Sequence, residues 1–429
     1  MESILEDIRV VDLTHVWFGP WTTMMLAEMG AKVIKVEPPW GALGRIEEYG
    51  PMYGGAAPSF HHLNLNKKGM VINLKHEEGL KLIKALIAKS DVIINNFAPG
   101  TMEKLGLSYE DCRAVKPDII YAVLSGFGDT GPYREYSSYA PIAEAAAGYA
   151  RQMGDSIDPE GPPKGLVGFF GDLAPGTMAA MAIIGAIRFR DKTGKGQKID
   201  CAQFDTMFAY NTGITNFFVS GKDEVERRKE SEERRKQREK DQPQNPLQSI
   251  RGYIKVRDGY VMIGGMRPKA IEALKETLGV DEEGLTKELV EEFIKEKTKV
   301  EAFNFFARCG MPCAPVYYGS ESAEDPHIIA RDMIVEVDHP LLGRTRAINF
   351  GVKMSESPGR VTSAAPLLGQ HQREIITKLL GYGEEEFDHL VKEGVIAYQP
   401  DLDKKLVNWK SQPPSFACRS EPWGTGLNR

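Results

Sequence analysis

The sequence predicts an α/β fold, with an open, parallel, Rossmann-like large domain and a smaller α+β domain. Three observations lead to this prediction: a strand–helix–strand pattern within residues 8–38, the continuation of this alternation to residue 125, and a sharp change of composition at residue 221. A strand–helix–strand unit of this length forms a right-handed crossover between parallel strands. We therefore expect a ligand crevice beyond the carboxyl ends of the strands.

β-Branched runs and apolar residues at helical spacing define the elements of the large domain, residues 1–221. Strands are predicted at residues 8–14, 30–38, 70–74, 91–96 and 119–125. Helices are predicted between them at residues 21–29, 78–89, 101–104 and 109–115. The loops at residues 36–38, 95–100 and 125–128 follow strands, so we expect them to border the crevice.

The second half of the chain begins with a highly charged stretch. Residues 222–241 carry both signs of charge in nearly equal measure, and we expect a solvated helix or connector at residues 222–246. A small domain is predicted at residues 247–326, starting with a hairpin that turns at Asp258-Gly259 and continuing with helices at residues 268–278 and 286–297. Residues 327–429 should return to the large domain, with helices at residues 372–379 and 384–392 and a C-terminal arm.

Composition excludes several classes of function. A net charge of -6 provides no basic field, so we expect no nucleic-acid partner. No apolar stretch approaches the roughly 20 residues of a membrane span, and the first residues do not resemble a signal peptide, so we expect a cytoplasmic protein with no membrane partner. The five cysteines are scattered, and Cys309 and Cys313 lack a second Cys or His pair, so we expect no metal.

Phosphate-binding motifs are incomplete in this sequence. No Gly-x-Gly-x-x-Gly follows the first strand, and Gly194-Lys-Gly lacks the rest of a Walker loop, so we expect no NAD. Cations near the predicted crevice are the remaining candidates for neutralising ligand phosphates, although each alone is more often a surface charge: Arg45, Lys67, Lys68, Lys75 and Lys104.

One carboxylate stands out because glycines surround it. Asp172 lies within the glycine-rich residues 165–176, and a run of small and apolar residues follows it to residue 187. Asp is a preferred N-cap residue, and a helix N-terminus favours the ionised form of an acid. We therefore expect Asp172 to cap a buried helix and to be an anion near neutral pH. Most acids in such a pattern are only structural caps, so the pattern alone leaves both interpretations open.

Short blocks spread in order over nearly the whole chain carry a more specific signal. They are Val11-Asp-Leu-Thr with Gly19-Pro20, Met29-Gly-Ala-Lys-Val-Ile-Lys-Val-Glu-Pro, Asn66-Lys-Lys-Gly, Ser90-Asp-Val-Ile-Ile-Asn-Asn-Phe-Ala-Pro-Gly, Leu105-Gly-Leu, Leu124-Ser-Gly-Phe-Gly-Asp-Thr-Gly-Pro-Tyr, Gly171-Asp172, Thr193-Gly-Lys-Gly-Gln-Lys-Ile-Asp and Gly310-Met-Pro-Cys-Ala-Pro-Val. With these blocks the sequence resembles the family III CoA-transferases, which include formyl-CoA, carnitine and benzylsuccinate CoA-transferases.

The resemblance implies a covalent role for Asp172. In proteins of this type the Asp of the Gly-Asp motif attacks an acyl-CoA thioester and then carries CoA as an aspartyl-CoA thioester. CoA would be a substrate, an acyl-CoA the donor and a carboxylic acid the acceptor, without metal or NAD. The resemblance also implies an interlocked dimer, formed with an identical chain or with a paralogue.

The resemblance assigns further roles residue by residue. Asn96 and Phe97 would contact the adenine region of CoA, Lys75 and Lys104 would lie near its phosphates, and Tyr139 would lie beside the active centre.

Departures from the family pattern point to the acyl pocket, which would also include Gly171. Trp17 replaces a Gln of formyl-CoA transferases, Ala140 replaces a frequent acid, Ser137 replaces an expected cation, and residues 241–249 lack a glycine-rich loop. We therefore expect a larger and more apolar pocket than formate or oxalate requires, suited to carnitine-like, bile-acid-like or aryl and alkyl dicarboxylic acids.

Two alternatives stay open at this point. An acyl-CoA racemase shares this fold but usually pairs a His with the Asp. This chain has Ser138-Tyr139-Ala140 where that His is expected, and no other His between His76 and His327. The second alternative is a CoA-binding, non-catalytic subunit of a heteromeric transferase.

Overall fold

The structure is a computed structural model that describes residues 3–46, 52–241, 250–265, 268–281 and 283–397. The chain divides into two compact units, Met1–Thr212 with Asp332–Arg429 as unit 1, and Gly213–Arg331 as unit 2. The sequence predicts the corresponding changes at residues 221 and 327. Residues 242–249 and the predicted C-terminal arm from residue 401 lie outside the described residues.

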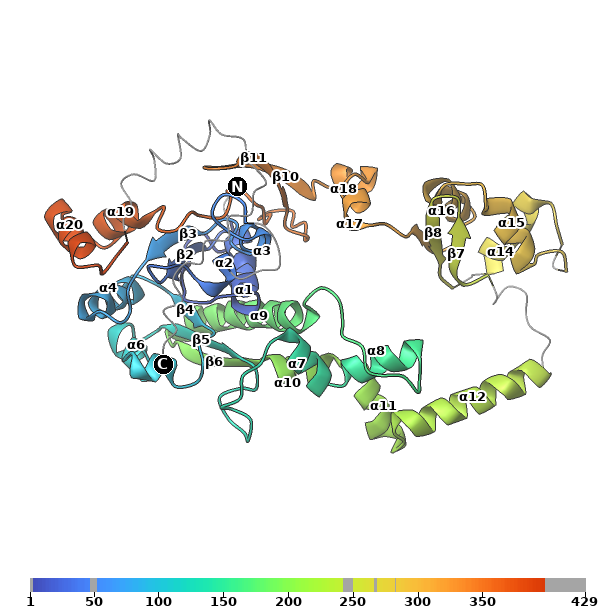
Figure 1. Cartoon of the computed structure of the whole chain (residues 1–429), viewed down its shortest axis with the longest axis horizontal. Coiled ribbons are helices and arrows are strands. Elements are labelled where there is room, and N and C mark those ends of the chain that lie inside the picture. Colours follow the sequence, from blue (N-terminus) through green and yellow to red (C-terminus); the bar gives the residue numbers. More distant parts are fainter. Residues whose placement is uncertain (1–2, 47–51, 242–249, 266–267, 282, 398–429) are drawn as a thin grey trace. The chain divides into compact units, whose positions relative to one another are not determined.

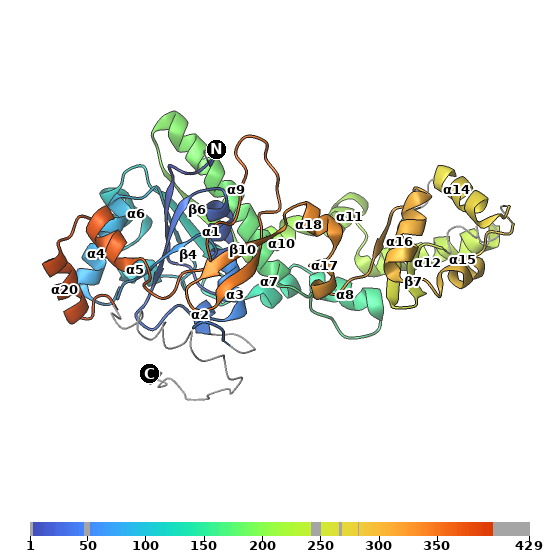
Figure 2. The same cartoon turned by 90° about the horizontal axis from the view of Figure 1, so that it is seen from above.

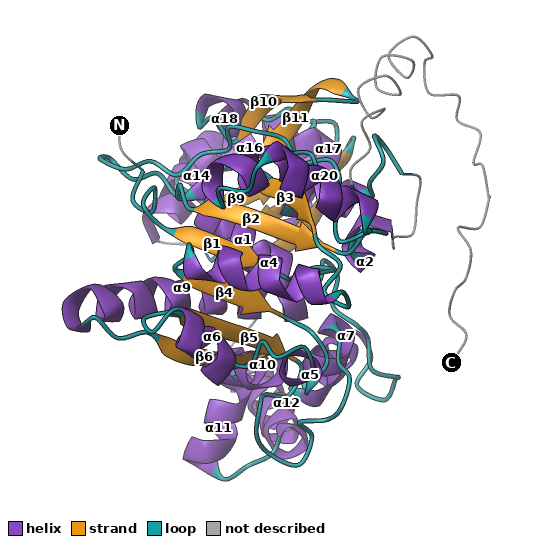
Figure 3. Ribbon diagram, turned by 90° about the vertical axis from the view of Figure 1, so that its left-hand side faces the viewer, coloured by secondary structure: helices purple, strands orange, loops and turns teal. Residues whose placement is uncertain are grey.

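Unit 1 is built on a six-stranded parallel sheet in the order β3-β2-β1-β4-β5-β6 (Figure 3). Its strands are β1 (Arg9–Asp12), β2 (Lys32–Glu37), β3 (Lys68–Val71), β4 (Val92–Asn95), β5 (Ile120–Ser125) and β6 (Gln197–Ala202). This is the strand order of doubly wound dinucleotide-binding folds, in which the direction of winding changes between β1 and β4. The predicted parallel α/β sheet is confirmed.

Strand β6 was missed by the sequence analysis, which predicts no strand between residue 125 and the hairpin of the small domain. It pairs with β5 at the edge of the sheet, and its residues alternate between exposed and half-buried until Ala202. Lys198 and Asp200 occupy the exposed positions, so the hydrophobic signal of a buried strand is absent. The element that follows it, α10 (Gln203–Tyr210), was missed with it.

Helices cover both faces of this sheet because successive strand residues point to opposite sides. Val11, Ile34 and Ile93 pack under α4 (Glu77–Ala88), α6 (Tyr109–Val115), the π-helix η1 (Ile375–Leu379) and α20 (Glu384–Lys392). Val10, Val33 and Val92 pack against α1 (Phe18–Glu28) and α9 (Phe170–Thr193). Figure 2 shows these two groups of helices on opposite sides of the sheet.

The remaining elements of unit 1 are short and lie mostly in the connections. They are α2 (Leu43–Ile46), α3 (Pro58–Leu63), α5 (Thr101–Lys104), α7 (Ala140–Ala146), α8 (Tyr149–Ile157), the antiparallel hairpin β10 (Ile334–His339) with β11 (Gly343–Ile348), and α19 (Gln372–Glu374). The helix predicted at residues 372–379 is therefore α19 followed by a π-helical turn, and the helix predicted at residues 384–392 is α20 (Figure 1).

Unit 2 contains a three-stranded antiparallel sheet with its own core. The predicted hairpin is confirmed as β7 (Gly252–Val256) and β8 (Gly259–Ile263), which pairs with β9 (Cys313–Pro315). The charged stretch forms α12 (Glu224–Asp241). The other helices are α11 (Thr212–Ser220), which begins at the boundary, α14 (Pro268–Leu278), α15 (Lys287–Ile294), α16 (Lys299–Arg308), α17 (Gly319–Ser322) and α18 (Pro326–Ala330).

One described helix, α9, is long and apolar enough to cross a membrane by length and composition alone. The sequence argument that no apolar stretch approaches this length is therefore wrong for α9. Half of its most apolar window is buried, and Ala179, Ala180 and Ile183 pack against the sheet. A buried core helix of a globular unit passes the same test, and the absence of a membrane partner stays a prediction.

Candidate active site

The loops that follow β1 and β4 meet at the point where the winding of the sheet changes direction. The backbone N–H of His15 donates to Oδ1 of Asn96, and Nδ2 of Asn96 donates to the carbonyl oxygen of His15, both at 2.9 Å. The ring of His15 stacks on Phe97 with 5.7 Å between centroids. His15, which the sequence analysis missed, thus contacts both Asn96 and Phe97, the residues predicted to contact adenine.

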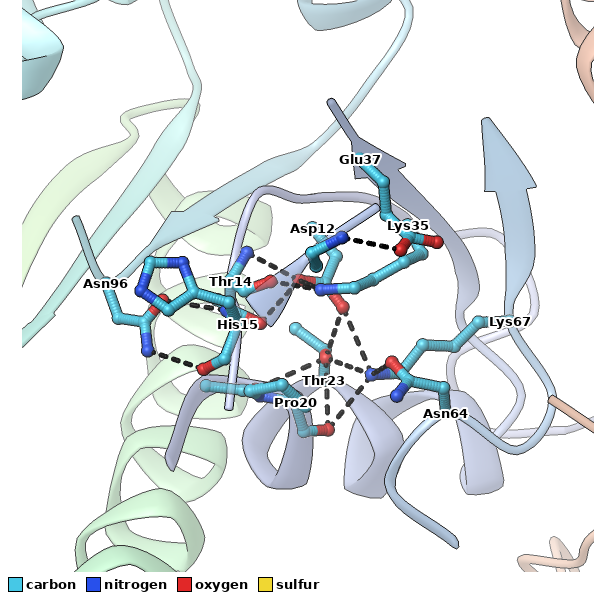
Figure 4. A network of polar contacts seen from close by, with 12 residues as sticks. Asp12, Thr14, His15, Pro20, Thr23, Lys35, Glu37, Asn64, Lys67 and Asn96 are labelled. Carbon is cyan, nitrogen blue, oxygen red and sulfur yellow. Dashed lines mark hydrogen bonds and ion pairs between the residues drawn. The ribbon is translucent and has the colours of Figure 1, made fainter. Parts of the chain in front are cut away.

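A buried polar network lies beneath these loops at the carboxyl end of β1 (Figure 4). Oδ2 of Asp12 is 3.1 Å from Nζ of Lys67, and Oδ1 is 3.5 Å from Nζ of Lys35. The hydroxyls of Thr14 and Thr23 donate to the same carboxylate, at 2.6 and 2.7 Å. Burial alone would raise the pKa of Asp12, but the two lysine charges and these hydrogen bonds hold it well below its usual range.

Three of the cations proposed from the sequence are engaged elsewhere. Lys67 is buried in the network around Asp12, and Arg45 is buried against Glu37, with 2.6 Å between Nη2 and Oε1. Lys68 pairs with Glu374 at the start of β3, away from the carboxyl ends of the strands. These three side chains are therefore not available to ligand phosphates in the crevice.

The two cations that the family resemblance selects remain exposed. Lys75 lies after β3, and its Nζ is 5.9 Å from the centroid of the Trp40 ring. Lys104 ends α5, which follows β4. Neither forms an ion pair within the described residues, so both can meet an anionic ligand at the carboxyl end of the sheet.

Asp172 lies in the first turn of α9, and its position differs from the prediction. Phe169 is the N-cap residue, with a left-handed backbone (φ 56°) and no side-chain cap, and the helix begins at Phe170. Asp172 is the third helical residue. The prediction that Asp172 caps the helix is therefore wrong, because the chain turns into α9 three residues earlier.

The surroundings of Asp172 also overturn the prediction that it is an anion near neutral pH. Its side chain is buried, with 7% of the residue exposed, and Oδ1 accepts a hydrogen bond of 2.5 Å from Nε2 of Gln203 at the start of α10. Burial raises its pKa to about 7, the hydrogen bond from Gln203 opposes this rise, and the charge of Glu144 adds to it. Burial therefore opposes the ionised form that the helix N-terminus was expected to favour.

Glu144 and Ala140, both on α7, pack against the start of α9. The backbone N–H of Gly171 donates to Oε1 of Glu144 at 2.8 Å, and Glu144 is 97% buried. A Cβ at Gly171 would lie 2.5 Å from the carbonyl oxygen of Ala140, so only glycine fits. The backbone of Ala140, rather than an acidic side chain, thus forms this wall of the site.

Aromatic side chains lie around the mouth of α9. The ring of Trp17 stacks on Phe169 with 4.3 Å between centroids and an interplanar angle of 18°. Val16 beside it has φ 65°, a strained conformation for a β-branched residue and one associated with functional sites. Tyr139 is the N-cap residue of α7 and is 61% exposed.

A single loop joins the two parts of the site. His15 contacts Asn96 and Phe97 at the crevice, and Trp17, two residues later, contacts Phe169 at the start of the helix that carries Asp172. The crevice and the buried carboxylate therefore border the same short segment of unit 1. Within the described residues, no group of three or more His, Cys, Asp or Glu side chains could hold a metal ion.

Sequence reasoning missed three residues of this site, and the available signals differ. Glu144 is a lone acid in a run of alanines, which could have marked a buried polar group. Gln203 was missed because the polar edge strand before it was missed. His15 has no local signal beyond its place after a strand.

Comparisons with known proteins show the family of the chain. The family model described as CoA-transferase family III matches residues 5–372. The chain is 31% identical to a formyl-CoA:oxalate CoA-transferase of Streptomyces avermitilis, over 92% of this chain and 100% of that protein. It is 30% identical to the succinyl-CoA:glutarate CoA-transferase of Homo sapiens, over 91% of this chain and 90% of that protein.

A solved structure shows the same fold. The crystal structure of a CAIB/BAIF family protein from Brucella suis is similar with a TM-score of 0.74 and 28% sequence identity, covering 88% of this chain and 100% of that chain.

Proposed function

The chain belongs to CoA-transferase family III, an enzyme family that transfers CoA between an acyl-CoA and a carboxylic acid, and we propose that Asp172 is the residue that carries the CoA. The observation that carries this proposal is the environment of Asp172. Its carboxyl group is buried, no cation pairs with it within the described residues, and one oxygen is held by Gln203. A carboxyl with a pKa near 7 is a more basic nucleophile than an ordinary aspartate.

The proposed reaction has two symmetrical halves. The free oxygen of Asp172 attacks the thioester carbon of the donor, the C–S bond breaks, and CoA leaves as a thiolate from a mixed anhydride. The thiolate then attacks Cγ of Asp172 and expels the donor acid, which leaves an aspartyl-CoA thioester. The acceptor carboxylate reverses these steps through a second anhydride, so Asp172 is regenerated and the thioester bond is conserved.

Burial of Asp172 supports the survival of these intermediates. Anhydrides and thioesters hydrolyse when water reaches them, and exclusion of water from a closed site prevents such side reactions. The N-terminal turn of α9 and the wall formed by Gly171 and Ala140 leave 7% of Asp172 exposed. Gly171 thus serves the site by allowing this close packing.

The crevice is the proposed site for the nucleotide end of CoA. Asn96 and Phe97 lie where doubly wound sheets bind nucleotides, at the carboxyl ends of β1 and β4. Lys75, on the loop after β3, and Lys104, at the end of α5, are exposed at the same edge, and we propose that they contact the phosphates. Tyr139 would contact the arm of CoA that reaches from this edge to Asp172.

For the acyl group we propose a substrate larger and more apolar than formate or oxalate. The stacked rings of Trp17 and Phe169 at the mouth of α9 support this choice, since aromatic faces bind apolar or aryl groups. Ala140 contributes no charge to the pocket. Carnitine-like, bile-acid-like, aryl and alkyl dicarboxylic acids are the candidate classes.

We also propose a dimer of two such chains, identical or paralogous, in the interlocked form of the family. Two large apolar side chains on the outer face of α9 support this dimer, because a partner chain could cover them. Met181 is 60% exposed and Phe189 is 45% exposed. Size-exclusion chromatography with light scattering would measure the mass of the assembly.

The decisive test is intact-protein mass spectrometry after incubation with a panel of acyl-CoAs that includes succinyl-CoA and an aryl-CoA. We expect a covalent CoA adduct that hydroxylamine removes and that Asp172→Asn lacks. Tight CoA binding without an adduct for any donor would contradict the stand-alone transferase and favour a non-catalytic subunit. Exchange of the α-proton of the acyl-CoA in D₂O, without an adduct, would favour a racemase.

A further inference from the structure

Glu144 caps a helix to which it does not belong. The N-cap residue of α9, Phe169, offers no side-chain acceptor, and the free N–H of Gly171 is bound instead by Oε1 of Glu144 from α7, at 2.8 Å. Glu144 is 97% buried, so water does not weaken this contact. A charge-assisted hydrogen bond to a helix N-terminus is among the stronger contacts that an acid makes.

This contact explains why the helix N-terminus does not keep Asp172 ionised. The positive end of α9 faces two buried acids. Its N–H donor goes to Glu144, while the side chain of Asp172 accepts, among the described residues, from the neutral Gln203 of α10. The contact of α9 with α1 is also uncharged, since Trp21 donates to Thr177 at 3.0 Å. Within the described residues neither acid forms an ion pair, and the charge of Glu144 makes ionisation of Asp172 more costly.

We propose that Glu144 is a positioning residue for Asp172: it holds the first turn of α9 in place, and its charge acts on the reacting carboxyl. The proposal rests on the proposed nucleophilic role of Asp172. The hydrogen bond orients the turn through Gly171, one residue from Asp172. The charge makes Asp172 more basic, hence more nucleophilic once it ionises.

Two substitutions separate these contributions. In Glu144→Gln the amide oxygen can still accept from Gly171, but the charge is lost. In Glu144→Ala both are lost. The matched control is Glu385→Gln, which removes the same charge from an exposed position on α20 of the same unit.

The first measurement is the rate of Asp172 acylation against pH, followed by mass spectrometry. For Glu144→Gln we expect the midpoint to fall by on the order of one pH unit, which is a tenfold change in the ionised fraction below the midpoint. We also expect a lower plateau rate at high pH, because the less basic carboxylate is the weaker nucleophile. Glu144→Ala should lose the adduct, and Glu385→Gln should match the wild type.

The second measurement does not require turnover. The melting temperatures of wild type, Asp172→Asn, Glu144→Gln and the double variant are recorded from pH 5 to pH 9, and the cycle reports how Glu144 shifts the titration of Asp172. An unchanged midpoint in Glu144→Gln in both measurements would overturn the proposal, as would an equal loss in Glu144→Gln and Glu144→Ala. If no acyl-CoA modifies the wild type, the proposed function fails, while this cycle still decides the role of Glu144.

Discussion

Asp12 and Asp172 are both buried acids of unit 1, yet their surroundings are opposite. Asp12 lies at the carboxyl end of β1 with Lys35 and Lys67 beside it and two hydroxyls bound to it. Asp172 lies in the first turn of α9 with Gln203 bound to it and Glu144 nearby. The pKa of Asp12 is held well below its usual range, and that of Asp172 is raised to about 7.

The comparison shows that burial by itself does not identify a reactive acid. Both acids lose water, and desolvation acts on both in the same direction. The difference comes from the cations. Asp12, with two buried lysines beside it, is held in a structural network, whereas Asp172, without a cation, stays available for covalent catalysis. Asp12 lies at the carboxyl end of β1, and the structure assigns it to stability.

The largest expected effect concerns the chemical role of Asp172. Asp172→Asn should lower CoA transfer by at least about 10⁴-fold, as for loss of a nucleophile, because the amide cannot form the anhydride. Steady-state assays with the productive acyl-CoA would measure the loss. A covalent adduct retained in Asp172→Asn would show that Asp172 is not the residue that carries the CoA.

The second effect concerns stability at Asp12. Asp12→Asn should lower the free energy of unfolding by about 3–5 kcal/mol, because Lys35 and Lys67 would remain buried without a counter-charge. Urea unfolding at pH 7 measures it. The control Asp7→Asn removes an exposed acid near β1 and should change stability by less than about 0.5 kcal/mol. A cost for Asp12→Asn no larger than that of the control would mean that the network contributes little.

The third expected effect is that Asp172 and Asp12 change the free energy of unfolding with pH in opposite directions. The folded state holds the proton of Asp172 up to pH 7, while the unfolded chain releases it near the ordinary value of 3.8, so this group lowers the free energy of unfolding as pH rises from about 4 to 7. Asp172→Asn should therefore stabilise the protein by about 2–4 kcal/mol at pH 8 and by much less at pH 4.

The stabilisation from Asp12 has the reverse sign. Its depressed pKa contributes stability that is present above the unfolded pKa and is lost as pH falls through the folded pKa. Thermal unfolding across pH 4–8 for wild type and Asp172→Asn checks the difference. A stabilisation that is independent of pH would argue that Asp172 does not titrate in this range.

The smallest expected effect concerns the hydrogen bond between Gln203 and Asp172. Gln203→Leu removes the hydrogen bond that favours the ionised form, so the midpoint of Asp172 acylation should rise above 7 by on the order of one pH unit. This is the opposite direction to Glu144→Gln. If the midpoint fell in Gln203→Leu, or if Gln203→Leu and Glu144→Gln shifted it equally, Gln203 could not be the neutral donor and Glu144 the like charge beside Asp172.

Local sequence was sufficient for the parts of the fold with a strong hydrophobic pattern. β1, β2, β4 and β5 are runs of buried β-branched residues, and α4 shows one apolar face, so the parallel sheet could be predicted. β6 could not, because an edge strand with Lys198 and Asp200 exposed lacks that pattern. α7 lies among small residues without a clear period, so the element carrying Glu144 was missed.

The sequence by itself determined that a glycine-flanked acid lies near the start of a long apolar helix, and ordered motifs around it determined the family. Only the tertiary structure decided what that acid is bound to and whether it is charged. Glu144 lies 27 residues before Gly171, and Gln203 lies 31 residues after Asp172, on separate helices. The pKa of a buried group depends on all charges and donors within a few ångströms, and chain folding, not spacing along the chain, brings those groups together.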